Sequence, residues 1–338
     1  MPAAIWEAVV QTLWLVWMFA AVVRKPDVIL VQNPPAIPTL LVVLAAARLR
    51  GARLVVDWHN LAWAVLALGL GARHPGVSLA RWYEGLLGRR ADAHLCVSDA
   101  LATELARWGM RPVSVLRDRP AARFAPLDAA ARRVVRRRLA DSLGLGGREP
   151  AIVVSPTSWT RDEDFDLLLA AVQRCEALVQ DRVFPEVLVL LTGRGARRAG
   201  FEARAAKLPG RRLHVRTAWL EPDEYPRVLG AADLGLCLHR SASGLDLPMK
   251  IVDLHGAGLP VCALDYGPCL DEMLRHDDTG LRFADAETLA RQWVALLGTF
   301  PATTPDLDRL RANVEKARGT TWRAGWEAEA REILLAHA

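Results

Sequence analysis

Short apolar runs alternate with helix-length segments along the whole chain, a pattern typical of parallel sheets covered by helices. In the first half, the runs that predict strands are Val28–Gln32, Leu54–Asp57, Leu95–Val97 and Val113–Leu116. In the second half they are Ile152–Ser155, Val187–Thr192, Leu213–Arg216, Leu234–Leu238 and Val261–Leu264. We therefore expect an α/β fold with two Rossmann-like domains facing across a cleft, with ligands bound at the carboxyl ends of the strands.

A glycine-rich stretch near the middle of the chain is the best linker in the sequence. It places a linker at residues 141–150, between a first domain, 1–140, and a second domain, 151–315. The remaining residues, 316–338, contain an amphipathic segment that we expect to form a helix crossing back to the first domain. A chain of 338 residues is long enough to bury a core in both domains.

The apolar segment Ile5–Val23 resembles a short membrane span. A span needs about 20 apolar residues, whereas polar residues such as Glu7 and Gln11 interrupt this segment. Its tryptophans suit either anchoring at a membrane interface or packing in a core. We therefore favour a helix that packs in the first domain and also leans on a membrane over a true span.

The charge distribution narrows the class of partner. The net charge of +5 is modest, but arginine is unevenly distributed and abundant in the first domain. This asymmetry suits an anionic substrate or a membrane face, although solvated helix surfaces are a common cause as well. Because no basic–aromatic pattern or binding module is present, we expect no nucleic acid partner. The five cysteines form no CxxC pair, which indicates a reducing, cytosol-facing compartment and no structural metal.

The segment Ser241–Val261 carries the most informative chemistry in the sequence. A glycine-containing loop leads into a helix whose first position suits Pro248, and helix N-termini present unpaired N–H groups to anions. Lys250 and Asp253 share a helix face, so one can contact a diphosphate while the other accepts hydrogen bonds from sugar hydroxyls. This combination suits a nucleotide-sugar site, and an ordinary helix-to-strand connection is the alternative.

The turn after the strand at Ile152–Ser155 offers further phosphate ligands. The hydroxyls and N–H groups of Thr157 and Ser158 are well placed for phosphate oxygens. The acidic residues 162–164 fit a DxD metal motif, but acids at a helix start explain them fully, with Thr160 as the N-cap. We therefore predict no metal site here.

Two other strand ends in the second half carry residues that are candidates for binding the nucleotide sugar. Arg194, in the sequence TGRG, is able to clamp a phosphate through two hydrogen bonds, although a lone GxG is often only a tight turn. Trp219 follows the next strand and suits contact with a nucleotide base, and a core tryptophan is an equally good interpretation.

In the first half, strand residues give way abruptly to the polar turn Asp57-Trp58-His59-Asn60. Histidine titrates near neutral pH, so His59 beside Asp57 can accept a proton from an attacking hydroxyl. Capping of the following helix is the alternative role for His59. Gln32 and Asn33 end the preceding strand, and their amides either bind sugar hydroxyls or form the turn.

Taken together and in this order, five motifs resemble those of the chitobiosyldiphosphodolichol β-mannosyltransferase family. They are VQNPPAIPT (Val31–Thr39), DWHN (Asp57–Asn60), SPTSWTRDEDF (Ser155–Phe165), TAWLEPDEYP (Thr217–Pro226) and SGLDLPMKIVD (Ser243–Asp253). The resemblance implies a GT-B fold, GDP-mannose as donor and GlcNAc2-diphosphodolichol as acceptor. It also implies inversion at the anomeric carbon to give a β-1,4 linkage, with no cofactor.

The resemblance also implies roles for matching residues. It places Lys250 and the loop containing Ser243, Gly244 and Asp246 toward the donor diphosphate, and Asp253 toward the ribose. It places the 57–60 turn, with Asn60, toward the acceptor.

The same resemblance implies that the protein is located at the cytosolic face of the endoplasmic-reticulum membrane. It also implies other glycosyltransferases of the pathway as further partners. Relative to the family pattern, the chain begins after the membrane anchor and the first strand–loop–helix unit. We therefore expect an incomplete first domain with an open sheet edge and exposed apolar surface. The alternatives are a GT-B transferase for another sugar nucleotide, and a truncated, inactive paralogue that binds a nucleotide or a partner.

Overall fold

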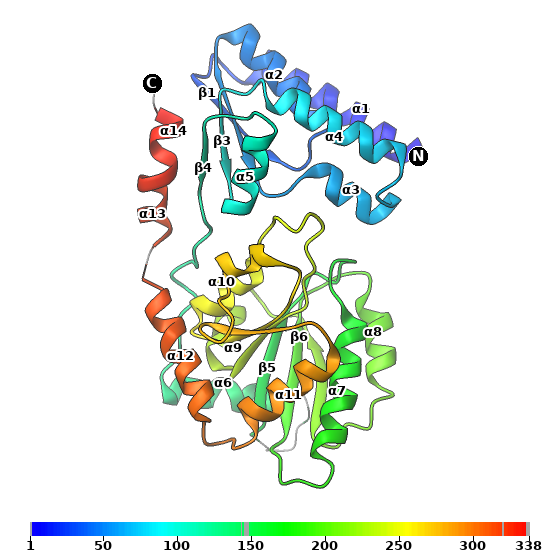
Figure 1. The fold of residues 1–338 in the computed structure, drawn as a ribbon, viewed down its shortest axis with the longest axis vertical. Coiled ribbons are helices and arrows are strands. Elements are labelled where there is room, and N and C mark those ends of the chain that lie inside the picture. The colour runs from blue at the N-terminus through cyan, green and yellow to red at the C-terminus, as the bar shows by residue number, and fades with distance from the viewer. Residues whose placement is uncertain (1, 143, 145–148, 320, 336–338) are drawn as a thin grey trace. The chain divides into compact units, whose positions relative to one another are not determined.

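The structure, a computed structural model, describes residues 2–142, 144, 149–319 and 321–335. Packing divides the chain into two compact units. The first unit comprises Met1–Arg117, Ala242–Leu247 and Arg323–Ala338, and the second comprises Asp118–Ser241 and Pro248–Trp322. Each unit has its own parallel sheet with helices between successive strands, as the alternation of apolar runs predicts (Figure 1).

The sheet of the first unit has four parallel strands in the order β1-β2-β3-β4. The strands are β1 (Val28–Asn33), β2 (Arg53–Trp58), β3 (Ala93–Cys96) and β4 (Val113–Val115). All four coincide with predicted runs to within two residues at their ends. The register places Gln32 beside Asp57, so the polar ends of β1 and β2 are neighbours.

Helices cover both faces of this sheet because successive strand residues point to opposite sides. In β2, Leu54, Val56 and Trp58 pack into one core, and Val55 packs into a second core with Leu334 from the C-terminal segment. The helices are α1 (Pro2–Trp17) continued by a short π-helix (Met18–Val22), α2 (Thr39–Arg50), α3 (Ala62–Leu70), α4 (Pro75–Gly88) and α5 (Asp99–Arg107). The C-terminal segment contributes α13 (Trp322–Gly325), a short π-helix (Trp326–Ala330) and α14 (Arg331–Leu335).

The edge strand β1 and helix α1 expose apolar side chains. Within the described residues β1 pairs only with β2, and the side chain of Leu30 is 50% exposed. On α1, Trp6, Trp14 and Trp17 are each more than half exposed, so core packing does not explain these tryptophans. Among the described residues, no helix combines the length and the apolar character that crossing a bilayer requires.

The second unit has a six-stranded parallel sheet in the order β10-β9-β8-β5-β6-β7. The strands are β5 (Ala151–Pro156), β6 (Val187–Thr192), β7 (Leu213–Ala218), β8 (Leu234–Cys237), β9 (Val261–Leu264) and β10 (Gly280–Phe283). The strand β10 is absent from the sequence prediction, because a four-residue run after a turn carries little periodicity.

Two helical layers enclose this sheet. In β5, Val153 packs into one core with α7 and α11, and Ile152 packs into the opposite core with α9 and α10. The helices are α6 (Ala129–Ser142), α7 (Phe165–Val179), α8 (Arg198–Ala205), α9 (Glu224–Ala231), α10 (Met249–Gly256), α11 (Ala286–Leu297) and α12 (Pro305–Ala317), with a 3-10 turn at Pro268–Glu272. The doubly wound architecture therefore places the carboxyl ends of its strands at one edge.

The passage between the units differs from the predicted linker. By packing, the division lies after Arg117, whereas the sequence placed it at 141–150, where residues 143 and 145–148 lie outside the described residues. The arginine-rich helix α6 belongs to the second unit because Arg132 and Arg136 bind Asp233 there. Two of its basic residues thus fasten the helix to the second unit.

Each unit holds a histidine whose protonation is unfavourable. Burial lowers the pKa of His94 to about 4, and its Nδ1 accepts a hydrogen bond from Trp58 Nε1 at 3.1 Å. Burial also lowers the pKa of His255 to about 4. Both side chains are therefore neutral in the folded protein at neutral pH, whereas in the unfolded chain they titrate near pH 6.5.

We predict that the free energy of unfolding falls as the pH drops from about 6.5 to 4, because the unfolded chain binds protons that the folded chain excludes. Each histidine contributes a slope of up to about 1.4 kcal/mol per pH unit in this window. Urea unfolding at several pH values measures this dependence of the free energy of unfolding on pH. His94→Gln, which retains an acceptor for Trp58, is expected to flatten the slope, and an unchanged slope in this variant would contradict the prediction.

Candidate functional site

A pocket of about 310 Å³ lies at the carboxyl edge of the sheet in the second unit. Its walls come from the segments that follow three neighbouring strands, β5, β6 and β7. Thr157 and Ser158 follow β5, Gly193 follows β6 and Trp219 follows β7, while Lys250 enters from α10. The structure therefore brings together four of the residues predicted to bind a nucleotide sugar.

The loops after β5 and β6 approach so closely that only glycine fits at two positions. Gly193 has a φ of +119°, and a Cβ there would lie 2.0 Å from the backbone oxygen of Thr157. A Cβ on Gly195 would lie 2.4 Å from Cβ of Trp159. The GxG of this segment is therefore required by close backbone packing, whatever ligand it contacts.

Trp219 lines the pocket, and Arg194 packs on its ring without lining the pocket itself. The Arg194 guanidinium lies 4.0 Å from the centre of the Trp219 ring, a cation–π contact. Trp219 is 44% exposed, so the alternative of a core tryptophan is wrong. Arg194 is held by this ring beside the pocket, where it remains available to an anion.

Lys250 is held by a carboxylate that the sequence analysis did not select. Its Nζ forms an ion pair with Glu163, whose side chain is 1% exposed. Glu163 also accepts hydrogen bonds from the N–H groups of Ser158, at 3.1 Å, and Thr160, at 3.2 Å. Glu163 therefore shapes the loop after β5 and positions the Lys250 ammonium, and its place in the acidic run concealed this role.

The other two acids of the run have partners of their own. Asp164 is the N-cap of α7 and accepts from the N–H of Leu167, so the prediction of Thr160 as the cap is wrong. Asp162 forms a 2.9 Å hydrogen bond with His239 Nδ1, which lowers the pKa of the carboxyl below its usual value. Each acid is thus accounted for by local structure.

Within the described part of the chain, no group of three or more histidine, cysteine or acidic side chains could hold a metal ion. The five cysteines, all of them described, are buried as free thiols.

Asp253 lies one turn beyond Lys250 on α10 and is held by a tyrosine that lines the same pocket. Tyr225 Oη lies 3.2 Å from Asp253 Oδ2, and burial raises the pKa of Tyr225 so that its phenol stays protonated and donates. Burial also raises the pKa of Asp253. Tyr225 is thus a residue of the pocket that the sequence analysis did not select.

In the first unit, the polar turn after β2 brings Asp57 and His59 together. His59 Nε2 lies 3.1 Å from Asp57 Oδ2, and both side chains are partly exposed. The alternative role of His59 as the cap of α3 is not supported, because the first N–H groups of that helix bind another side chain. The pair therefore has the geometry of a base oriented by a carboxylate.

That other side chain is Glu84, which is fully buried. Its oxygens accept 2.8 Å hydrogen bonds from the N–H groups of Ala62 and Trp63 and from Nδ2 of Asn33. Asn33 Nδ2 also lies 3.2 Å from the carbonyl oxygen of Asn60. Because Asn33 is fully buried, its amide serves the turn, which is the second of its two predicted roles.

The loop that contains Ser243, Gly244 and Asp246 packs with the first unit and does not line the 310 Å³ pocket. The hydroxyl of Ser243 lies 2.8 Å from Asn60 Oδ1, next to the 57–60 turn. Asp246 is nearly buried and lies 3.3 Å from the same hydroxyl. Gln32, by contrast, is exposed at the end of β1.

A family model described as "Glycosyl transferase 4-like domain" matches residues 2–117, which coincide with the first segment of the first unit. Among solved structures, an α,α-trehalose-phosphate synthase from Burkholderia xenovorans aligns with a TM-score of 0.67 at 12% identity, covering 97% of this chain and 77% of its own. This likeness and the two parallel sheets with alternating helices confirm the predicted α/β fold class of the GT-B type.

Curated relatives align over nearly the whole chain. The chitobiosyldiphosphodolichol beta-mannosyltransferase of Homo sapiens is 38% identical over 352 residues, which cover 95% of this chain and 75% of the relative. A relative from Arabidopsis thaliana named UDP-glycosyltransferase TURAN is 36% identical, covering 97% of this chain and 80% of its own. The chain is therefore a glycosyltransferase and belongs to the chitobiosyldiphosphodolichol β-mannosyltransferase family.

Proposed function

We propose that the chain transfers mannose from GDP-mannose to the chitobiose of a dolichyl diphosphate, with inversion, to form a β-1,4 linkage. The pocket that Thr157, Ser158, Trp219 and Lys250 line is the observation that carries this proposal. It combines an aromatic face for a base, hydroxyl and N–H donors, and a fixed cation for a diphosphate. The family membership supplies the acceptor class.

In this proposal, the donor is held by named contacts. Lys250 and Arg194 bind the diphosphate, where negative charge grows as the sugar departs, so these cations stabilise the transition state more than the ground state. Trp219 contacts the base, and Asp253 accepts hydrogen bonds from the ribose. Tyr225 orients the Asp253 carboxylate through their hydrogen bond.

On the acceptor side, we assign His59 as the base that takes the proton of the attacking hydroxyl. Asp57, 3.1 Å away, orients the imidazole and stabilises its protonated form. Asn60 and Gln32 contact the acceptor sugars, and Glu84 fixes the shape of the turn from beneath. Inversion follows because the hydroxyl attacks the face of the sugar opposite the diphosphate.

The acceptor carries a lipid, so we further propose that the first unit lies on the cytosolic face of the endoplasmic-reticulum membrane, beside other glycosyltransferases of the pathway. Helix α1 supports a membrane surface as partner, because Trp6 is 68% exposed and Leu13 is 65% exposed. Arg24 and Lys25 follow on exposed positions and suit anionic headgroups.

A different donor is the second candidate, because one relative is named a UDP-glycosyltransferase. Incubation of the chain with a chitobiosyl diphosphate lipid and either GDP-mannose or UDP-sugars decides between the two. We expect product with GDP-mannose alone, and dissociation of bound GDP at a lower concentration of GDP-mannose than of UDP-mannose. Turnover only with a UDP-sugar would contradict the assignment of the donor, and GDP binding without turnover under all conditions would favour a binding protein.

The ion pair between Lys250 and Glu163 leads to a two-part prediction. Lys250→Ala is expected to reduce turnover at least tenfold and also to lower stability by about 3–5 kcal/mol, because it leaves the buried Glu163 unpaired. The double variant with Glu163→Gln should recover much of the stability but none of the turnover. Chemical unfolding and initial rates measure the two effects.

The exposed Lys207 provides the matched control for this prediction, and Lys207→Ala should change neither quantity. Recovery of turnover in the double variant would show that Lys250 acts only on stability and would remove it from the donor site.

His59→Ala is expected to lower the rate by about 10²–10⁴-fold while GDP affinity stays within twofold, because the base does not touch the nucleotide. The fall of the rate at acidic pH should also disappear from the pH–rate profile of this variant. His74→Ala, which removes an exposed histidine of the same unit, is the control. A stable His59→Ala variant that retains most of its rate would exclude His59 as the base.

A further inference from the structure

A second pocket of the second unit, of about 460 Å³, lies at the edge of the sheet opposite the candidate donor pocket. Asp233, at its floor, directly precedes β8 and accepts a 2.8 Å hydrogen bond from the N–H of Ile152 in β5. The site therefore sits at the amino ends of these strands, away from the transfer chemistry. The basic residues of the pocket come from α6 and α12.

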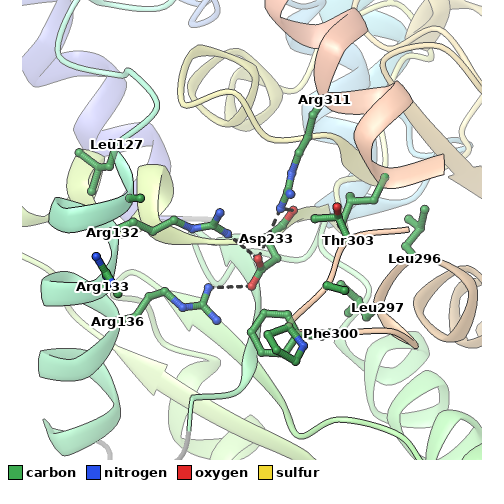
Figure 2. A pocket seen from close by; sticks show the side chains of 14 residues that line it. Leu127, Arg132, Arg133, Arg136, Asp233, Leu296, Leu297, Phe300, Thr303 and Arg311 are labelled. Carbon is green, nitrogen blue, oxygen red and sulfur yellow. Dashed lines mark hydrogen bonds and ion pairs between the residues drawn. The ribbon is translucent and has the colours of Figure 1, made fainter. Parts of the chain in front are cut away.

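The pocket gathers arginines around this single carboxylate. Figure 2 shows Arg132 and Arg136 extending toward Asp233 from one side and Arg311 from the other. Arg136 Nη1 lies 2.8 Å from Asp233 Oδ2, Arg311 Nη2 lies 3.4 Å from Oδ1, and Arg132 Nη2 also pairs with Oδ1. The side chains of Asp233 and Arg136 are 5% and 8% exposed, whereas those of Arg132 and Arg311 are partly exposed and reach the pocket surface.

The charges in this pocket do not balance. Its described lining contains four arginines, including Arg133, and Asp233 is its only acid. Backbone carbonyls at the end of α9 accept from Arg132 and Arg136, which offsets only part of the excess. Burial lowers the pKa of Arg132, the charge of Asp233 opposes this shift, and the neighbouring Arg136 and Arg311 add to it. A bound anion would relieve this repulsion.

Several donors of the cluster remain available to such an anion. Within the described residues, Arg133 has no hydrogen-bond or ion-pair partner, although it lines the pocket. Arg311 donates to described groups only through Nη2, which leaves Nε and Nη1. A structural network that merely fastens α6 and α12 to the sheet does not require these free donors.

The opposite wall is apolar. The Arg136 guanidinium lies 5.2 Å from the centre of the Phe300 ring, and Leu297 and Leu307 line the same side. The volume exceeds that of a single small ion and falls in the range of about 300–1,000 Å³ typical of ligand pockets. The pocket thus has room for an organic group beside an anion.

We propose that this pocket binds a phosphate-type oxyanion, either free or carried on a small organic molecule. Arg132, Arg133 and Arg311 supply the charge-assisted hydrogen bonds, and Phe300 flanks the organic group. Binding there stabilises the second unit by adding negative charge beside the partly exposed Arg132 and Arg311 and the exposed Arg133. It is independent of the proposed transfer reaction.

Calorimetric titration of the full chain with inorganic phosphate, at an ionic strength kept constant with chloride, tests the proposal. Arg133→Gln should weaken phosphate binding about tenfold, since one charge-assisted hydrogen bond is lost. Arg137→Gln is the matched control, because Arg137 is an exposed residue of the same helix outside the pocket. In chloride alone, the wild type, Arg133→Gln and Arg137→Gln should unfold at the same temperature. Neither Arg133 nor Arg137 has a partner among the described residues.

A second probe, phenyl phosphate, separates the two sources of the oxyanion. Tighter binding of phenyl phosphate than of phosphate, lost in Phe300→Ala, would assign the site to a phosphate carried on an organic group, and equal affinities would assign it to free phosphate. Arg133→Glu should abolish either form of binding. Equal phosphate affinity of the wild type, Arg133→Gln and Arg133→Glu would overturn the proposal.

Discussion

The candidate donor pocket depends on one buried ion pair, between Glu163 and Lys250. A carboxylate removed from water is costly unless its oxygens are paired and hydrogen-bonded. Glu163 meets this requirement by accepting two backbone N–H groups of the loop after β5 and by pairing with the ammonium of Lys250 on α10. The same interaction therefore sets the shape of the loop and the position of the cation, so the pocket is formed before any ligand arrives.

The first unit uses the same principle. Glu84 is buried beneath the turn that follows β2 and accepts two N–H groups at the start of α3 and the amide of Asn33. Burial raises the pKa of Glu84, and the three donors oppose this shift by stabilising the carboxylate. The partly exposed pair of Asp57 and His59 lies directly before this helix, so its orientation depends on a fully buried carboxylate.

Asp233 is a third buried carboxylate, and its environment differs from the other two in one respect. Glu163 faces one cation and Glu84 faces none among the described residues, whereas Asp233 faces three guanidinium groups. One carboxylate fastens α6 and α12 to the sheet, but it does not neutralise the arginines that surround it. This excess of positive charge distinguishes the arginine pocket from an ordinary structural ion pair.

The sequence alone determined the fold class and most of the strands, because apolar periodicity reflects burial directly and needs no knowledge of partners. It also determined which strand ends carry polar chemistry, so Thr157, Trp219, Lys250 and the pair of Asp57 and His59 were found. Only the tertiary structure revealed that Glu163 holds Lys250 and that Tyr225 holds Asp253. It likewise revealed that Glu84 holds the start of α3 and that Asp233 holds the arginines of α6 and α12. It also decided that Asn33 serves the turn and that Asp164 caps α7. The reason is physical: an acid's role depends on which partners surround it, and Lys250 for Glu163, Asn33 for Glu84 and the arginines for Asp233 lie tens of residues away in the chain.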